Sequence, residues 1–211
     1  MTWRTRLAWI ALGSSCVALT MSRVGLGQGS DDARLARLDS TTRFAVAALV
    51  DSARRLRLPT EPLVDKALEG EKKGANGTRI VFAVRGLSAE LRSARSSLGA
   101  GATADEITAG ANALHAGFPM RDLARLRAAA QQAGRKRLTL PLAVGTDLVA
   151  RGVPVATASD IVLSLTRGGL RDAEFTLFQR NVRLDIEHGA DAATAAQTRA
   201  RGAMLHTGRT S

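Results

Sequence analysis

The segment IVFAVRGLSAELRSARSSLG, residues 80–99, carries the clearest structural pattern of this sequence. Its apolar side chains recur at steps of four and three residues, which places them on one face of an α-helix. These residues are Ile80, Val84, Leu87, Leu91, Ala94 and Leu98, and Gly99 follows where a helix commonly ends. Gly86 lies inside the segment. Because glycine in a helix interior costs about 1 kcal/mol relative to alanine, we expect another helix to pack closely against it.

Helical patterns continue on the N-terminal side of this segment. A similar apolar stripe covers residues 35–56 and is closed by Pro59. A short helix is expected next, with Thr60 as its cap, Pro62 in its first turn and Gly70 at its end.

On the C-terminal side, Thr103 and Glu106 match a capping box, which predicts a helix that runs to His115. The rest of the chain repeats one pattern, in which a glycine ends one helix and a proline or aspartate begins the next. This pattern occurs at Gly117-Phe118-Pro119, Gly152-Val153-Pro154, Gly169-Leu170-Arg171-Asp172 and Gly189-Ala190-Asp191. The steps from Gly117 to Gly152 and from Gly152 to Gly189 are 35 and 37 residues.

A period of this length is typical of stacked helical hairpins, although the tetratricopeptide signature is absent. The sequence therefore predicts an all-α fold, either a bundle or a short solenoid of hairpins with a period of about 35 residues. Its core is expected to consist of Ala, Leu and Val with the five phenylalanines as large anchors; these are Phe44, Phe82, Phe118, Phe175 and Phe178.

The N-terminus has the layout of a secretory signal peptide. Residues 1–6 carry two Arg and no acid, and residues 7–21 form an apolar run shorter than the ~20 residues that span a bilayer. Cleavage is expected near Gly27, with an uncleaved membrane anchor as the alternative. We then expect an N-terminal helical segment at 28–57, a helical-hairpin domain at 58–202 and a flexible basic tail at 203–211.

Removal of the signal changes the composition of the chain. The full sequence has 30 Lys and Arg against 19 Asp and Glu, a net charge of +11, and removal of residues 1–27 lowers this to +8. The shortened chain has no Cys, Trp or Tyr. It therefore has no disulfides, and it lacks the aromatic platforms used to stack on sugars and on single-stranded nucleic acid.

Three stretches carry a resemblance to a known group of proteins: residues 58–70 (LPTEPLVDKALEG), 79–81 (RIV) and 147–154 (DLVARGVP). Together they resemble exported helical proteins of high-GC bacteria that have no assigned activity. The resemblance covers residues 58–202 and implies a location in the bacterial cell envelope. The 26 Arg against 4 Lys are consistent with a GC-rich genome, so part of the basic character reflects base composition.

Two basic stretches are candidate anion sites. The loop at 70–78 is rich in glycine and precedes a helix, and its candidate residues are Lys72, Lys73, Asn76 and Thr78. The second stretch is Arg135, Lys136 and Arg137, which together with Arg199, Arg201 and Arg209 offer a basic face to anionic envelope polymers or lipid head groups. The alternative interpretations are a flexible helix connection and ordinary solvated surface charge.

Catalytic motifs are absent from the sequence. There is no Gly-x-Ser-x-Gly motif, and the acid pairs Asp105/Glu106 and Asp172/Glu174 occupy first helical turns, where acids serve as caps. His115 and His188 are expected at helix C-termini. An enzyme site would have to combine His188 with dispersed acids; the candidates are Asp185, Glu187 and Asp191.

We therefore predict an exported, periplasmic or secreted, interaction or scaffold protein with a protein partner in the envelope. The alternatives are an envelope enzyme with a dispersed site and a binder of anionic polymer or lipid head groups. No cofactor, no metal and no sequence-specific nucleic acid are predicted.

Overall fold

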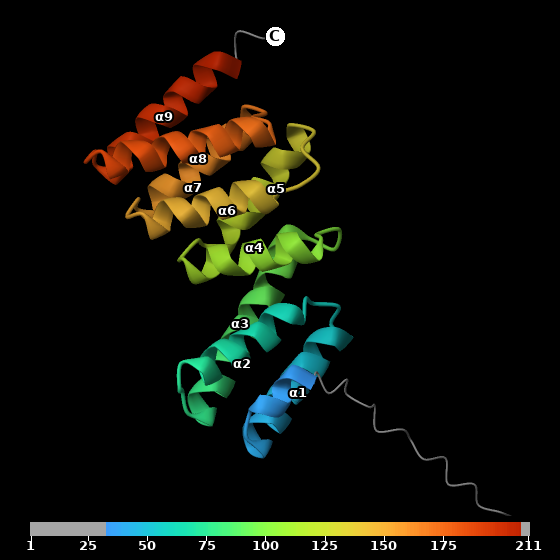
Figure 1. Cartoon of the computed structure of the whole chain (residues 1–211). Coiled ribbons are helices and arrows are strands. Elements are labelled where there is room, and N and C mark those ends of the chain that lie inside the picture. The colour runs from blue at the N-terminus through green and yellow to red at the C-terminus, as the bar shows by residue number, and fades with distance from the viewer. Residues whose placement is uncertain (1–32, 208–211) are drawn as a thin grey trace, which may run out of the picture.

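The computed structural model describes residues 33–207, with side chains to Leu205 (Figure 1). Over this range the chain forms one 3₁₀ turn and nine α-helices and contains no strand, so the predicted all-α fold is confirmed. The elements are η1 (Ala33–Arg37), α1 (Ser40–Arg55), α2 (Glu61–Lys72), α3 (Gly77–Leu98), α4 (Ala104–His115), α5 (Met120–Gln132), α6 (Thr139–Ala150), α7 (Val155–Arg167), α8 (Asp172–Glu187) and α9 (Ala192–Thr207).

From α3 onward, each helix packs on the helix two places further along the chain. The helices α3, α5, α7 and α9 form one layer, and α4, α6 and α8 form the other. Contacts between α3 and α4, α6 and α7, and α8 and α9 join the two layers, and α1 and α2 flank α3 (Figure 1). This arrangement is a short solenoid, and the predicted period of about 35 residues corresponds to two successive helices.

The glycines that the sequence places at helix ends adopt the left-handed conformation. Gly117, Gly152 and Gly189 have φ of 100°, 93° and 92°. In each turn the following residue donates its N–H back to the helix, as from Phe118 N to Ala113 O at 3.0 Å. Phe118 is buried, so the residue that follows the turn is fixed in the core.

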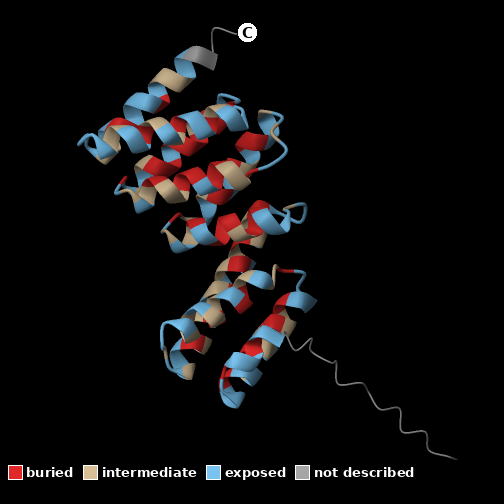
Figure 2. Cartoon of the chain, in the orientation of Figure 1, coloured by how far each residue is buried: buried red, intermediate tan, exposed pale blue. Residues whose placement is uncertain are grey.

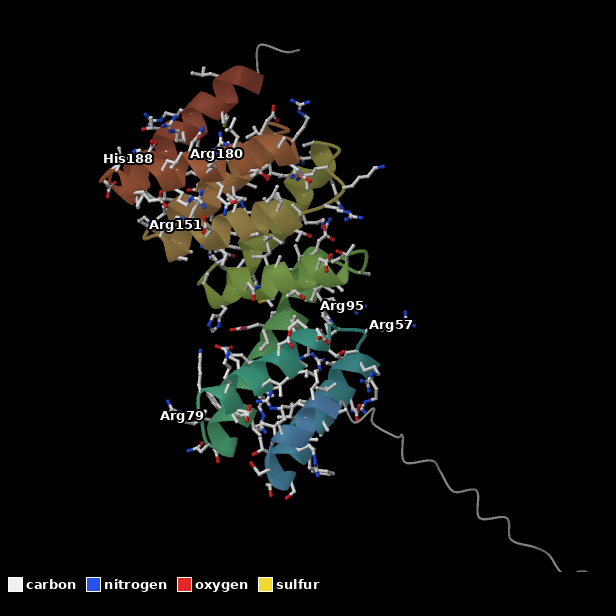
Figure 3. The ribbon with its side chains drawn as sticks, in the orientation of Figure 1. Arg57, Arg79, Arg95, Arg151, Arg180 and His188 are labelled. Carbon is white, nitrogen blue, oxygen red and sulfur yellow. The ribbon has the colours of Figure 1, made fainter. Side chains whose placement is uncertain are left out.

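One helix end uses the same turn without glycine. Arg57, after α1, has φ of 54°, and Leu58 N donates to Ala53 O at 2.9 Å. Arg95 of α3 donates to the carbonyls of Leu56 and Arg57 at 2.8 and 2.7 Å and so holds this turn in place (Figure 3). A left-handed arginine carries steric strain that glycine would not.

Two predicted helix limits are wrong. The helix expected over 35–56 is interrupted after η1, because the Asp39 side chain accepts from Thr42 N at 2.9 Å and begins α1 there. Gly70 does not end α2, which continues to Lys72. Instead, Gly70 allows α3 to approach, since a Cβ at this position would lie 2.8 Å from the Ile80 side chain.

The prediction that all five phenylalanines lie in the core is wrong for two of them. Phe118, Phe175 and Phe178 are buried, but Phe44 and Phe82 are 78% and 77% exposed. The buried stripe along the stack is made largely of Leu, Val and Ala, which fill the space between closely packed helices (Figure 2).

A buried carboxylate connects α4 to α6. Glu106, 1% exposed, accepts from Thr103 N at 2.9 Å in the predicted capping box, and it also accepts from Leu138 N at 2.8 Å. Arg127 Nη2 of α5 lies 3.0 Å from its Oε2. Burial opposes ionisation of Glu106, but these hydrogen bonds and the Arg127 guanidinium outweigh it and lower its pKa.

Three predictions concern the ends of the chain and its relation to a membrane. The predicted signal peptide at 1–27 and its cleavage near Gly27 lie outside the described residues. Residues 203–207, expected in a flexible tail, belong to α9. Within the described range, none of the helices has the length and apolar character required to span a bilayer.

Candidate binding groove

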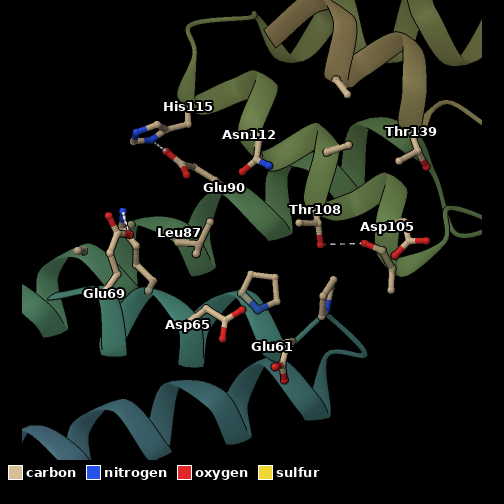
Figure 4. A pocket seen from close by; sticks show the side chains of 18 of the residues that line it. Glu61, Asp65, Glu69, Leu87, Glu90, Asp105, Thr108, Asn112, His115 and Thr139 are labelled. Atoms are coloured by element: carbon tan, nitrogen blue, oxygen red, sulfur yellow. Dashed lines mark hydrogen bonds and ion pairs between the residues drawn. The ribbon is translucent and has the colours of Figure 1, made fainter. Parts of the chain in front are cut away.

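A large cavity lies over the middle of α3. This helix has 22 residues and is about 33 Å long, whereas α2 and α4 have 12 residues each and are about 18 Å long. The helix α2 packs on the first half of α3, with Gly70 against Ile80, and α4 packs on the second half, with Gly110 against Ala94. Between them remains an open groove of about 1330 Å³ (Figure 4).

The groove is lined by one face of each of α2, α3 and α4, and by Thr139 and Ala143 of α6. The floor consists of Phe82, Ala83, Gly86, Leu87 and Glu90 of α3; one wall consists of Glu61, Pro62, Asp65, Lys66 and Glu69 of α2; the other wall includes Asp105, Thr108, Ala109, Asn112 and His115 of α4. On each helix the lining residues recur at steps of three or four, as Phe82, Gly86 and Glu90 do on α3, which is expected for one side of a helix.

Gly86 has a different role from the one predicted. No heavy atom lies within 4 Å of a Cβ built at this position, so no helix packs closely against it. The residue is exposed on the groove floor, and the absence of its side chain leaves the groove deeper there. The helix therefore bears the cost of an interior glycine without a packing reason within the described structure.

Carboxylates gather in the groove although the chain is basic. Five acids line it, against one lysine and one histidine; the acids are Glu61, Asp65, Glu69, Glu90 and Asp105. The described residues as a whole contain 26 Lys and Arg and 17 Asp and Glu, a net charge of +9. The groove is therefore a local concentration of negative charge on a positive molecule.

Two carboxylates of α2 share one guanidinium. Arg34 of η1 donates to both oxygens of Glu61 at 2.8 and 2.9 Å and lies 3.4 Å from Asp65 Oδ1. The side chains of Glu61 and Asp65 remain 66% and 61% exposed.

The other groove acids differ in their partners. Hydrogen bonds from Lys73 and Lys66 lower the pKa of Glu69 to about 2, so this carboxylate is already neutralised by two cations. Glu90 Oε1 lies 3.0 Å from His115 Nδ1 of α4, across the upper part of the groove (Figure 4). Asp105 is exposed in the first turn of α4, where the helix dipole favours an acid.

The candidate anion residues of the loop at 70–78 are placed around the start of α3. Lys73 is bonded to Glu69, and the Asn76 side chain caps α3 by accepting from Arg79 N at 3.0 Å. Lys72 and Thr78 are exposed. The loop is a short capped connection between two helices, and anion binding there stays a prediction.

The second candidate stretch separates into one structural residue and two exposed ones. Arg135 donates to Leu170 O and to Asp172, and its guanidinium lies 4.8 Å from the Phe175 ring centre. Its side chain is only 12% exposed. Arg135 thus holds the start of α8, and within this stretch Lys136 and Arg137 are the exposed cations. Of the other predicted cations, Arg201 is exposed, Arg199 is bonded to Asp185, and Arg209 lies outside the described residues, so anion binding by this face stays a prediction.

The three acids of the enzyme alternative each have a partner among the described residues. Both Asp185 oxygens accept from Arg199 at 2.6 Å, which lowers the pKa of this carboxyl group. Asp191 caps α9 by accepting from Thr194 N, and Glu187 lies 3.7 Å from Arg183. The cavity that Asp185 lines does not include His188, which ends α8 (Figure 3). Among the described residues, no His, Cys, Asp or Glu group is placed to hold a metal ion.

The sequence does not predict the groove, although it contains one signal of its lining. Glu61, Asp65 and Glu69 recur at four-residue steps and so mark an acidic face of α2. Phe82, Gly86 and Glu90 recur in the same way on α3. What the sequence did not indicate is that the two faces meet in one groove. Comparisons of the chain with protein-family models, with curated proteins and with solved structures found no match.

Proposed function

We propose that this protein is an exported interaction module that holds a segment of a partner protein in the groove between α2 and α4. The signal-like pattern of residues 1–27 supports export, and the groove supports binding. The expected location is the periplasm or the extracellular space.

The observation that carries the binding proposal is an exposed aromatic side chain on the floor of the groove. Phe82 is 77% exposed there, beside the helix-interior Gly86. Aromatic side chains are enriched in the cores of protein interfaces, where a partner removes them from water. An apolar ring next to a site with no side chain offers a partner both a contact and room to approach.

The size of the groove favours a chain segment over a small molecule. Its volume of about 1330 Å³ exceeds the ~300–1,000 Å³ typical of pockets for small ligands. It is also open along one side, as required for a segment that enters and leaves as part of a larger protein.

A selection of random 16-residue peptides displayed on phage, with the immobilised full chain as target, tests the binding proposal. Gly86→Leu fills the groove floor, and we expect it to abolish binding of the selected peptides. Gly202→Leu is the matched control, because Gly202 also lies within a helix with open space at its Cβ but outside the groove. Peptides that bind the wild type and both variants equally, or a selection without binders, would refute the proposal.

A reporter fusion tests export separately. Residues 1–32 joined to an alkaline phosphatase that is active only after export are expected to give activity at the cell surface or in the periplasm. Replacement of Val17 and Leu19 by Arg interrupts the apolar run and is expected to abolish it. Activity that survives this change, or an inactive wild-type fusion, would contradict export.

A further inference from the structure

We infer that the segment held in the groove is cationic, with Lys or Arg side chains beside Asp65 and Asp105 and an apolar side chain over the α3 floor. This inference rests on the proposed function and specifies the chemistry of the partner. It is carried by the distribution of charge around the groove.

The acids that remain for a ligand lie on opposite walls. Asp65 of α2 is 61% exposed, and its contact with Arg34, at 3.4 Å, is shared with the closer contact of Arg34 to Glu61. Asp105 projects from the first turn of α4 on the other wall (Figure 4). Glu69 contributes little, because Lys66 and Lys73 already neutralise it.

The apolar floor lies between these two walls. Phe82 and Leu87 of α3 line it, and Gly86 leaves the space between them open. A segment that places one apolar side chain on this floor therefore has a carboxylate on either side. Cationic side chains at its edges complement both walls, whereas acidic ones would face like charge.

The positive net charge of the protein distinguishes binding at the groove acids from nonspecific electrostatic attraction. The described chain carries +9, so its overall field repels a cationic peptide and attracts an anionic one. Preference for a cationic peptide therefore opposes the overall field and indicates a local source of attraction, which the Asp65 and Asp105 variants below assign to the groove acids. Added salt screens whichever field dominates, so the sign of the salt effect identifies that field.

The experiment uses two fluorescein-labelled 16-residue peptides with the same apolar stripe, one with Lys and the other with Glu at every polar position. Binding to the full chain is measured by fluorescence anisotropy. We expect the Lys peptide to bind at least about tenfold more tightly than the Glu peptide, and its affinity to fall between 50 and 500 mM NaCl. Equal binding, a preference for the Glu peptide, or an affinity for the Lys peptide that rises with salt would overturn the inference.

Two pairs of charge-removing variants test whether the groove acids are responsible for binding of the Lys peptide. Asp65→Asn with Asp105→Asn is expected to weaken binding of the Lys peptide about tenfold, the scale of two partly screened charge pairs. Asp160→Asn with Glu187→Gln changes the net charge equally outside the groove and is expected to change affinity less than twofold. Equal effects of the two pairs would overturn the inference.

The Gly86→Leu variant separates this inference from the proposed function. If Gly86→Leu abolishes binding but the charge variants and salt do not matter, the groove binds a partner and the cationic specificity is wrong. If the Lys peptide binds the Gly86→Leu variant as well as the wild type, the groove is not its site and the inference falls. The random-library selection then still decides the proposed function, because it does not depend on peptide charge.

Discussion

Replacement of Glu106 by alanine tests how the two layers of the solenoid are joined. Three groups lose their acceptor: the N–H of Leu138, a fully buried residue, the Arg127 guanidinium, 17% exposed, and the Thr103 N–H in the cap. An unsatisfied buried N–H costs about 1–3 kcal/mol, and removal of one partner of a buried ion pair costs about 3–5 kcal/mol. Because these contributions overlap and Arg127 keeps some access to water, we expect a total loss of about 3–5 kcal/mol.

Urea unfolding of the full chain, followed by circular dichroism at 222 nm, measures this loss. With a urea dependence of about 2–3 kcal/mol/M, the midpoint should fall by roughly 1–2 M. Thr103→Ala removes only the cap and is the control, with an expected loss of about 1 kcal/mol. If Glu106→Ala is no more destabilising than Thr103→Ala, the link to Leu138 and Arg127 contributes nothing and the reasoning is wrong.

The stabilisation by the Glu106 carboxylate depends on pH. The pKa of Glu106 is lowered in the folded protein, so its ionised form stabilises the fold at neutral pH, and this contribution is lost as pH falls below 4.5 and through the folded pKa. Glu106→Gln keeps an oxygen for Leu138 N–H but cannot ionise. We expect its stability to be intermediate at pH 7 and to approach that of the wild type in acid; a stability difference between the two that does not change with pH would contradict this.

Three further predictions concern single residues and are measured by the same unfolding assay. Arg57→Gly should stabilise the fold by about 0.5–1 kcal/mol, because relief of the left-handed strain exceeds the added entropy of glycine in the unfolded chain; destabilisation would show that the arginine side chain matters more than its backbone. Gly86→Ala should stabilise by about 0.5–1 kcal/mol, as should Gly202→Ala, since both positions are open; a loss at Gly86 alone would mean that its surroundings are tighter than described. Arg135→Ala should cost about 1–3 kcal/mol, whereas Lys136→Ala should stay within about 0.5 kcal/mol; equal effects would remove the structural role of Arg135.

Most of the fold was predictable because its signals are local. The capping box at Thr103 and the left-handed glycines at Gly117 and Gly152 act within one helical turn, and each lies where the sequence placed it. Gly70 and Gly86 were misinterpreted because their roles depend on what lies opposite them in space. Ile80 approaches the first, and nothing approaches the second.

The groove was not predictable for a related reason. Its acids lie on separate helices, and only the difference in length between α3 and its neighbours brings them around one opening. Phe82 fits the apolar composition of a core but faces outward, since α3 buries the stripe that contains Ile80 and Val84 instead. The negative charge of the groove and the exposure of Phe82 therefore follow from how the helices pack, and not from the periodic pattern of the sequence.

Because each helix packs on the helix two places further along the chain, the fold can gain or lose a hairpin at one end without a change at the other. Each helix depends on a few near neighbours, so the architecture is effectively one-dimensional. The groove is built mainly from α2, α3 and α4, with Thr139 and Ala143 added from α6, whereas α8 and α9 contact only α6, α7 and each other among the principal helix pairs. A hairpin gained or lost at the C-terminal end would alter the length of the molecule and leave the groove residues in place. Ligand specificity and molecular length can therefore vary independently in this architecture.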